Sequence, residues 1–143
     1  MRVLIVAALL AAGLPGTQAC AQAAPDAASQ PGPFAERFFQ TLKTGKVREA
    51  LATLGTTSPM MAKKIADDPS LSPQIEIALA AYGPVADWEK VNSEMLGTMV
   101  RRDTYILRHQ NAVTRWRFIY EHVGTGWVVA HFAFEDQAQT WFK

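Results

Sequence analysis

The chain is poor in cysteine and in net charge, and both shortages limit what it can be. Its 143 residues contain one cysteine, Cys20, so no disulfide can form within a single chain. Lys and Arg number 14 against 13 Asp and Glu, which gives a net charge of +1. Non-specific nucleic-acid binding needs a basic surplus, so we expect no nucleic acid as a partner.

The sequence also lacks the short motifs that mark common chemistries. It has no Gly-rich phosphate loop, no serine-nucleophile signature and no recognisable pair of catalytic carboxylates. Its three histidines, His109, His122 and His131, lack the close i, i+2 or i, i+4 spacing of a strong set of metal ligands. We therefore expect no metal and no cofactor, and a domain better suited to binding than to catalysis.

The first clear positive feature is an export signal. Met1-Arg2 supplies a positive charge, residues 3–14 are almost entirely apolar, and Ala-x-Ala sites follow at 19–21 and 21–23. This pattern is typical of a secretory signal peptide, and the apolar run is too short for a permanent membrane span. We interpret residues 1–23 as a signal peptide and expect a periplasmic or secreted bacterial protein. In an alternative interpretation, Cys20 is lipidated and anchors the chain to a membrane.

The rest of the chain divides into a tether and one domain. Residues 24–32, rich in Ala, Pro, Gln, Ser and Gly, predict a flexible tether, and residues 33–143 predict a single domain. Apolar periodicity with stop signals predicts helices at 33–44, 47–55, 58–68 and 72–82. Strands are expected at 88–96, 98–109, 112–122 and 127–135. Helices before an antiparallel meander predict an α+β fold, with the helices packed on a curved, cone-like sheet.

Two short turns, at 110–111 and 124–125, set the predicted register of the last three strands. Counting from these turns predicts that one face of the sheet is aromatic, and we assign this face to the side under the helices. Charged and polar side chains lie among its apolar residues. The candidate residues on it are Arg101, Asp103, Tyr105, Trp116, Tyr120 and His131. One explanation is an internal ion pair, Arg101–Asp103 or Asp103–His131, that satisfies itself. The other is a polar-floored pocket for a small ligand, and these six residues are its candidate lining.

The opposite face of the sheet carries arginines instead of aromatic residues. The same counting places these residues there: Arg102, Arg108, Val113, Arg115, Arg117, Ile119 and Glu121, with Val128, Phe132 and Phe134 from the last strand. We expect this face to be solvated or to meet a partner. Arg115 and Arg117 are the candidate interface residues.

The last strand also carries a family resemblance. Residues 126–132 read Gly-Trp-Val-Val-Ala-His-Phe, and with the helices-then-sheet layout they resemble the nuclear transport factor-like, or ketosteroid-isomerase-like, cone superfamily. The resemblance implies a conical pocket and frequent dimerisation through the open sheet face. Isomerase members use an acidic base with hydrogen-bond donors, which Asp103 and either Tyr105 or Tyr120 could imitate. One fold of this kind hosts many activities, so no single activity follows.

Three functions stay open at this point. The first is a non-enzymatic envelope domain that binds a small apolar or amphipathic ligand in the cone. The second is an interaction module, as a homodimer or accessory subunit, that acts through Arg115 and Arg117. The third is an isomerase- or dehydratase-type enzyme that uses Asp103, Tyr105 and His131.

Overall fold

The computed structural model describes residues 31–142. The predicted signal peptide, Cys20 and most of the predicted tether lie outside the described residues. Four helices come first in the described part: α1 (Phe34–Lys43), α2 (Val47–Gly55), α3 (Pro59–Asp67) and α4 (Leu71–Tyr82). Four strands and a short 3-10 helix follow: β1 (Val85–Leu96), β2 (Val100–His109), β3 (Val113–Val123), β4 (Gly126–Glu135) and η2 (Ala138–Thr140). The predicted α+β class is confirmed.

Local sequence signals fix the ends of the helices. Ser58 caps α3, since its Oγ accepts a hydrogen bond from the Met61 N–H at 3.1 Å, and Pro59 takes the first helical position. Gly83 ends α4 with a φ of +84°, and a Cβ added there would lie 2.8 Å from the Cβ of Gln110. The chain therefore turns from α4 into β1 at a position that favours glycine on two grounds.

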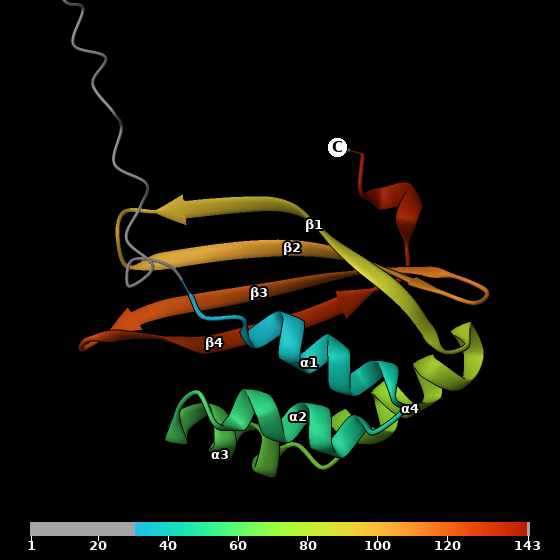
Figure 1. Ribbon diagram of the computed structural model, residues 1–143, viewed down its shortest axis with the longest axis horizontal. Coiled ribbons are helices and arrows are strands. Elements are labelled where there is room, and N and C mark those ends of the chain that lie inside the picture. The colour runs from blue at the N-terminus through green and yellow to red at the C-terminus, as the bar shows by residue number, and fades with distance from the viewer. Residues whose placement is uncertain (1–30, 143) are drawn as a thin grey trace, which may run out of the picture.

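The strands form a simple antiparallel meander in the order β1-β2-β3-β4. All four helices lie on one side of this sheet, and η2 lies on the other (Figure 1). We call the side under the helices the inner face; its central residues are Asp103, Tyr105, Trp116, Phe118 and Tyr120. We call the other side the open face; its central residues are Thr104, Ile106, Arg115, Arg117 and Ile119.

The core is a layer of aromatic rings between α1 and the inner face. The Phe39 ring lies 5.2 Å from that of Tyr105 and 5.8 Å from that of Trp116, and Phe38 lies 5.3 Å from Trp116. Phe38 and Phe39 stand side by side on α1, so together they cover the middle of the sheet. Edge-to-face and tilted ring pairs of this kind add to the free energy gained by burying apolar area. This layer fixes α1 against β2 and β3.

The register of the first hairpin follows the prediction, and that of the second follows it as far as Val129. Tyr105 pairs with Trp116 as expected. Tyr120 pairs with Val129, also as expected, but Ile119 pairs with His131, which leaves Ala130 as an extra, bulged residue. A bulge reverses the alternation of every residue after it. The predicted place of His131 on the aromatic face is therefore wrong: its side chain is exposed, and it pairs with a residue of the open face.

The same bulge corrects the predicted faces of Phe132 and Phe134. Both were expected on the arginine-bearing side, but both pack against the core. The Phe134 ring stacks on Trp116 at 4.7 Å, and the Phe132 ring lies 6.1 Å from that of Phe118. The gain from burying two phenylalanines explains why the bulge is favoured, because a regular β4 would expose both rings and bury an imidazole.

Lysines from the helices tie down two irregular points in the edge strands. Lys64 Nζ donates to the carbonyl of the bulged Ala130 at 2.9 Å, and Lys43 Nζ donates to the carbonyl of Ala86 at 2.7 Å, where β1 also shifts register. The backbone N–H of Val129 donates to Thr57 Oγ1 at 3.2 Å. Polar groups on both sheet edges thus have partners, which limits pairing with other strands there.

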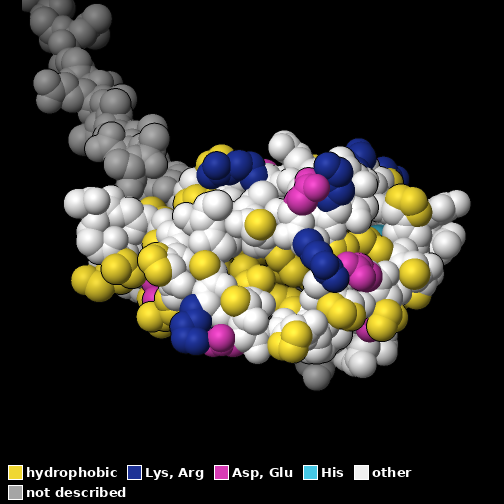
Figure 2. All heavy atoms as spheres, turned by 90° about the horizontal axis from the view of Figure 1, so that it is seen from below, with side chains coloured by type: hydrophobic (Ala, Val, Ile, Leu, Met, Phe, Trp, Pro, Cys, Tyr) yellow, Lys and Arg dark blue, Asp and Glu magenta, His cyan; other side chains and the backbone are white. Residues whose placement is uncertain are grey.

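The helix side of the molecule carries apolar side chains near its middle, with charged groups of both signs among and around them (Figure 2). None of the helices in the described part of the chain is long and apolar enough to cross a membrane.

Candidate functional site

Four of the six candidate pocket residues lie in the packed core. Asp103, Tyr105, Trp116 and Tyr120 are each at most 2% exposed. Phe38 and Phe39 of α1 occupy the space over them, at the ring distances given above. Arg101 is on the same face and half-buried, whereas His131 is not on this face. The structure therefore brings five of the six together, beneath α1.

Asp103 is the buried centre of a partly exposed ionic cluster. Its Oδ1 accepts hydrogen bonds from Ser93 Oγ at 2.6 Å and from Arg101 Nε at 2.7 Å, and its Oδ2 lies 3.1 Å from Lys90 Nζ. The predicted Arg101–Asp103 pair is therefore present. Burial acts to raise the pKa of Asp103, but the hydrogen bonds from Arg101, Ser93 and Lys90 outweigh it and hold the pKa below its usual range.

The two tyrosines of the inner face are buried beside this cluster. Tyr105 donates its hydroxyl to Glu36 Oε1 of α1 at 2.9 Å. Burial raises the pKa of Tyr105, and burial likewise raises that of Tyr120. A general base works best with a pKa near the working pH. A low-pKa aspartate held by cations and two high-pKa tyrosines suit a structural network better than proton transfer.

Three partners in this network were not among the predicted residues. Ser93 and Lys90 come from β1, where Ser93 pairs with Asp103 and Lys90 pairs with Tyr105. Glu36 comes from the first turn of α1. Counting back from the turn at residues 97–99 would have placed Ser93 opposite Asp103, but the extra residue Val91 shifts the register before Lys90 is reached.

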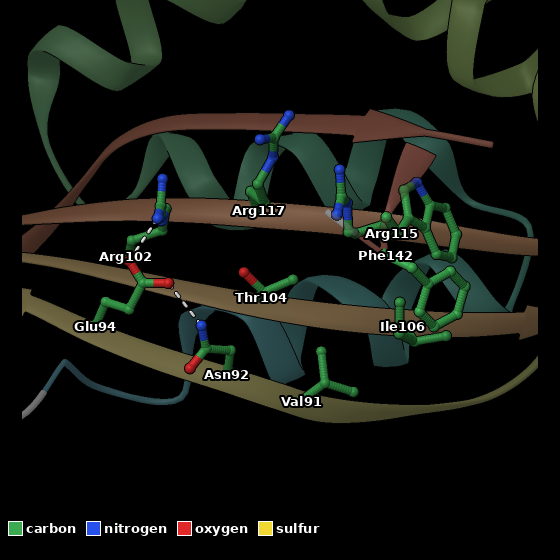
Figure 3. Close-up of a pocket in the computed structure, with 10 residues that line it drawn as sticks. Val91, Asn92, Glu94, Arg102, Thr104, Ile106, Arg115, Arg117 and Phe142 are labelled. Carbon is green, nitrogen blue, oxygen red and sulfur yellow. Dashed lines mark hydrogen bonds and ion pairs between the residues drawn. The ribbon is translucent and has the colours of Figure 1, made fainter. Parts of the chain in front are cut away.

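The open face carries a broad hollow with the two candidate interface arginines in it. The open-face hollow has a volume of about 680 Å³ and is lined by residues of β1, β2, β3 and the C-terminal segment: Val91, Asn92, Glu94, Arg102, Thr104, Ile106, Arg115, Arg117, Trp141 and Phe142. Figure 3 shows Arg115 and Arg117 projecting from β3 on the same side of the sheet as Thr104 and Ile106 of β2. None of the six candidate pocket residues is part of this lining.

Arg115 and Arg117 share one carboxylate. Arg115 Nε donates to Glu135 Oε1 at 2.7 Å, and Arg117 Nη2 lies 3.2 Å from the same oxygen. The Arg115 guanidinium also lies 5.2 Å from the centre of the Trp141 ring, a cation–π contact that holds the C-terminal segment over the open face. Both arginines are thus positioned on this surface by their neighbours.

The other arginines of the open face are paired too. Arg102 contacts Glu94, and Arg108 Nε donates to Asp87 Oδ1 at 2.9 Å. Across the face, four arginines meet five acidic residues: Arg102, Arg108, Arg115 and Arg117 with Asp87, Glu89, Glu94, Glu121 and Glu135. The charges nearly cancel, so this surface does not select for a strongly charged partner.

Apolar side chains lie between and around these ion pairs. Leu96 is 77% exposed and Phe142 is 91% exposed, and Val91, Val113 and Val123 are exposed as well. An isolated exposed apolar residue needs no explanation, but several on one flat face mark an interaction surface. The open face is therefore the candidate functional site that the geometry favours over the packed inner face.

The comparisons with known proteins give no family for this chain. Scans against protein-family models, curated proteins and solved structures each return no match. Among residues 31–142, no group of three or more His, Cys, Asp or Glu side chains is placed to hold a metal ion. The site is thus defined by its geometry alone.

Proposed function

We propose that the chain is a non-enzymatic interaction module that forms a homodimer through its open face. The observation that carries this proposal is the contrast across the sheet: four helices close the inner face, while the open face holds a hollow of about 680 Å³ bordered by exposed apolar side chains. The export pattern in residues 1–23 supports a place for this module in the bacterial envelope.

The size of the open face suits a second copy. Four strands of at least 10 residues, at about 3.3 Å per residue and about 4.8 Å between strands, give a rectangle of about 600 Å². Side-chain relief and the C-terminal segment enlarge this area toward the roughly 800 Å² that each partner contributes to a stable interface. Two twisted sheets can pack face to face about 10 Å apart.

The charges of the open face also suit a second copy. Because its arginines already contact acidic residues of the same face, two copies would meet with little net repulsion. A strongly acidic or basic partner would gain little binding energy from a face whose positive and negative charges nearly cancel. The resemblance to the cone superfamily implies dimerisation through the same face and so supports the same occupant.

The C-terminal segment supplies an anchor for the partner. Phe142 stands almost fully exposed at the rim of the open-face hollow, and exposed aromatic residues that enter a facing pocket often dominate binding energy. In a two-fold dimer each copy would present the same ring and the same hollow. We expect Phe142 of each copy to contact the open face of the other.

The small-ligand hypothesis for the cone receives less support from the geometry. A ligand on the inner face would have to displace Phe38 and Phe39, which make the ring contacts that hold α1 to the sheet. The enzyme hypothesis needs Asp103 and His131 on one face, and they lie on opposite faces.

A matched pair of variants tests the proposal. Ile106→Glu places a charge in the middle of the open face, and Ile77→Glu makes the same change on an exposed position of α4. We expect sedimentation equilibrium to give a dimer for the unmodified protein and for Ile77→Glu. At position 106, by contrast, a buried unpaired carboxylate opposes association. Ile106→Glu should be a monomer with unchanged circular dichroism. A monomeric unmodified protein, or equal effects of both variants, would contradict the proposal.

A further inference from the structure

A second hollow lies between α3 and the edge of β4, and it reaches the open-face residues Ile119, Glu121 and Val123. This α3–β4 hollow has a volume of about 360 Å³. Its buried lining comes from Met61, 2% exposed, and Val129, 1% exposed, and Ile119 and Val128 add further apolar surface. Met60 and Val123 are exposed and border it. Small-ligand sites have this composition: a mainly apolar concavity of a few hundred cubic ångströms.

The walls of the α3–β4 hollow are fixed by hydrogen bonds at both ends. Ser58 caps the start of α3, and Thr57 accepts a hydrogen bond from the Val129 N–H at 3.2 Å. Lys64, one and a half turns into α3, donates to the carbonyl of the bulged Ala130 at 2.9 Å. The bulge and α3 are thus held at a set distance, so the hollow needs little ordering when a ligand enters.

The polar groups of this hollow favour an anionic head group. Lys64 carries three N–H donors, and its bond to Ala130 uses one of them. His131, the residue that the bulge turns away from the core, also lines the hollow and is exposed. Glu121 is the one acidic residue in the lining, against one lysine and one histidine. An ammonium beside an apolar concavity complements a carboxylate on an apolar chain.

We infer that the α3–β4 hollow is a binding site for a medium-chain aliphatic carboxylate. At roughly 30 Å³ for each non-hydrogen atom, a space of this size holds about 12 such atoms, as in a ten-carbon fatty acid. The alkyl chain lies against Met61, Ile119 and Val129, and the carboxylate accepts hydrogen bonds from Lys64. This site shares Ile119, Glu121 and Val123 with the open face, but it does not rest on the proposed dimer, because its cation and one wall belong to α3.

The experiment titrates the whole protein with decanoate and follows the backbone amides by NMR. The variant is Lys64→Met, which removes the cation and keeps the apolar stem. The matched control is Lys63→Met, one residue earlier on α3, where the lysine instead contacts Asp67 at 2.6 Å on the exposed side. 1-Decanol is titrated as an uncharged ligand of the same chain length, and it reports whether the hollow stays intact in each variant.

We expect saturable one-to-one binding of decanoate, with shifts centred on the amides of Met61, Val129 and Ala130. Lys64→Met should weaken decanoate binding by about two- to fivefold and leave decanol binding unchanged, because the Lys64 ammonium is exposed and water partly replaces such a contact. Lys63→Met should change neither.

Two results would overturn the inference: no saturable binding of decanoate by the unmodified protein, or an equal loss with both lysine variants. If Lys64→Met lost the binding of decanol as well as that of decanoate, the role of the ammonium would also be overturned. The substitution would then have changed the apolar hollow itself. Sedimentation equilibrium on the same samples reports the oligomer separately, so failure of the dimer proposal is distinguishable from failure of this site.

Discussion

The two faces of one sheet use similar residues for different purposes. Strands β2 and β3 each contribute alternate side chains to the inner face and to the open face. On the inner face, Asp103 is buried beneath a layer of phenylalanines and gathers two cations that keep partial access to water. On the open face, the ion pairs Arg102–Glu94 and Arg108–Asp87 lie at the surface among exposed apolar residues. Residue type alone therefore does not tell which face carries the function; burial and partners do.

This difference also separates two kinds of ion pair. A carboxylate buried with cations becomes costly when its partners are removed, because an uncompensated charge is left in a poorly hydrated place. A pair that is half exposed on both sides contributes little, because water and salt replace it. We therefore expect the inner face to determine stability and the open face to determine association.

The largest expected effect is the loss of a core ring. Phe39→Ala removes four ring contacts under α1 and leaves a cavity, so we expect the free energy of unfolding to fall by about 3–5 kcal/mol. Phe142→Ala, the same change on the exposed C-terminal segment, should alter it by less than about 0.5 kcal/mol. Urea unfolding followed by circular dichroism measures both. Similar losses for the two variants would show that the ring layer under α1 is no more important for stability than the exposed C-terminal segment.

The next effect concerns the buried cluster. Asp103→Asn removes the charge that Arg101 and Lys90 face, and we expect a loss of about 1–3 kcal/mol, since both cations keep partial access to water. The matched change on the open face is Glu94→Gln, whose partner is Arg102; it should cost about 0.5 kcal/mol or less. Urea unfolding at neutral pH compares them. A cost of Glu94→Gln equal to that of Asp103→Asn would contradict the contrast between faces.

The smallest effect is a pH dependence that arises in the core. His109 is buried, with Nδ1 3.1 Å from the Gly83 carbonyl and Nε2 2.9 Å from Thr114 Oγ1. The carbonyl can only accept, so we assign the ring proton to Nδ1, and Nε2 then accepts from the Thr114 hydroxyl. Trp116 Nε1 donates to that same hydroxyl oxygen at 2.9 Å. This arrangement fits a neutral imidazole.

Burial lowers the pKa of His109 below 6.5, although the hydrogen bond to Gly83 opposes the shift. As pH falls through 6.5, the unfolded chain binds a proton that the folded chain does not, so stability decreases toward acid. We expect the free energy of unfolding to decrease between pH 7 and pH 5 for this reason. His109→Gln should flatten the slope measured by urea unfolding, whereas the exposed His131→Gln should leave it unchanged. If the slope were unchanged in His109→Gln, the pH dependence of stability would arise from other groups.

Much of the fold could be predicted from local signals. Glycine and proline at helix ends predict α1 to α4 to within a few residues, and the turn at 110–111 gives the correct pairing of Tyr105 with Trp116. The bulge at Ala130 could not be predicted by counting, because it depends on what β4 gains by turning Phe132 and Phe134 inward and on Lys64 of α3 binding the bulged carbonyl. His131 was misplaced for this reason.

The candidate site was only partly predictable. The alternation of β3 correctly places Arg115 and Arg117 on the face away from the helices. The sequence could not distinguish a pocket from a packed core over Asp103 and Tyr105, because that depends on how deeply Phe38 and Phe39 of α1 enter the space. The open-face hollow also depends on where the C-terminal segment lies, and no local pattern specifies this.

Thiol labelling at rising protein concentration tests most directly whether the open face is covered in a dimer, with an exposed position on α2 as the reference. In a Cys20→Ser background, which leaves the 143-residue chain without other thiols, a cysteine replaces Thr104 on the open face or the exposed Ala52 of α2. If the open face forms the dimer interface, thiol labelling at position 104 slows several-fold between dilute and concentrated protein, while labelling at position 52 keeps one rate. Labelling rates that do not depend on concentration at either position would contradict this interface.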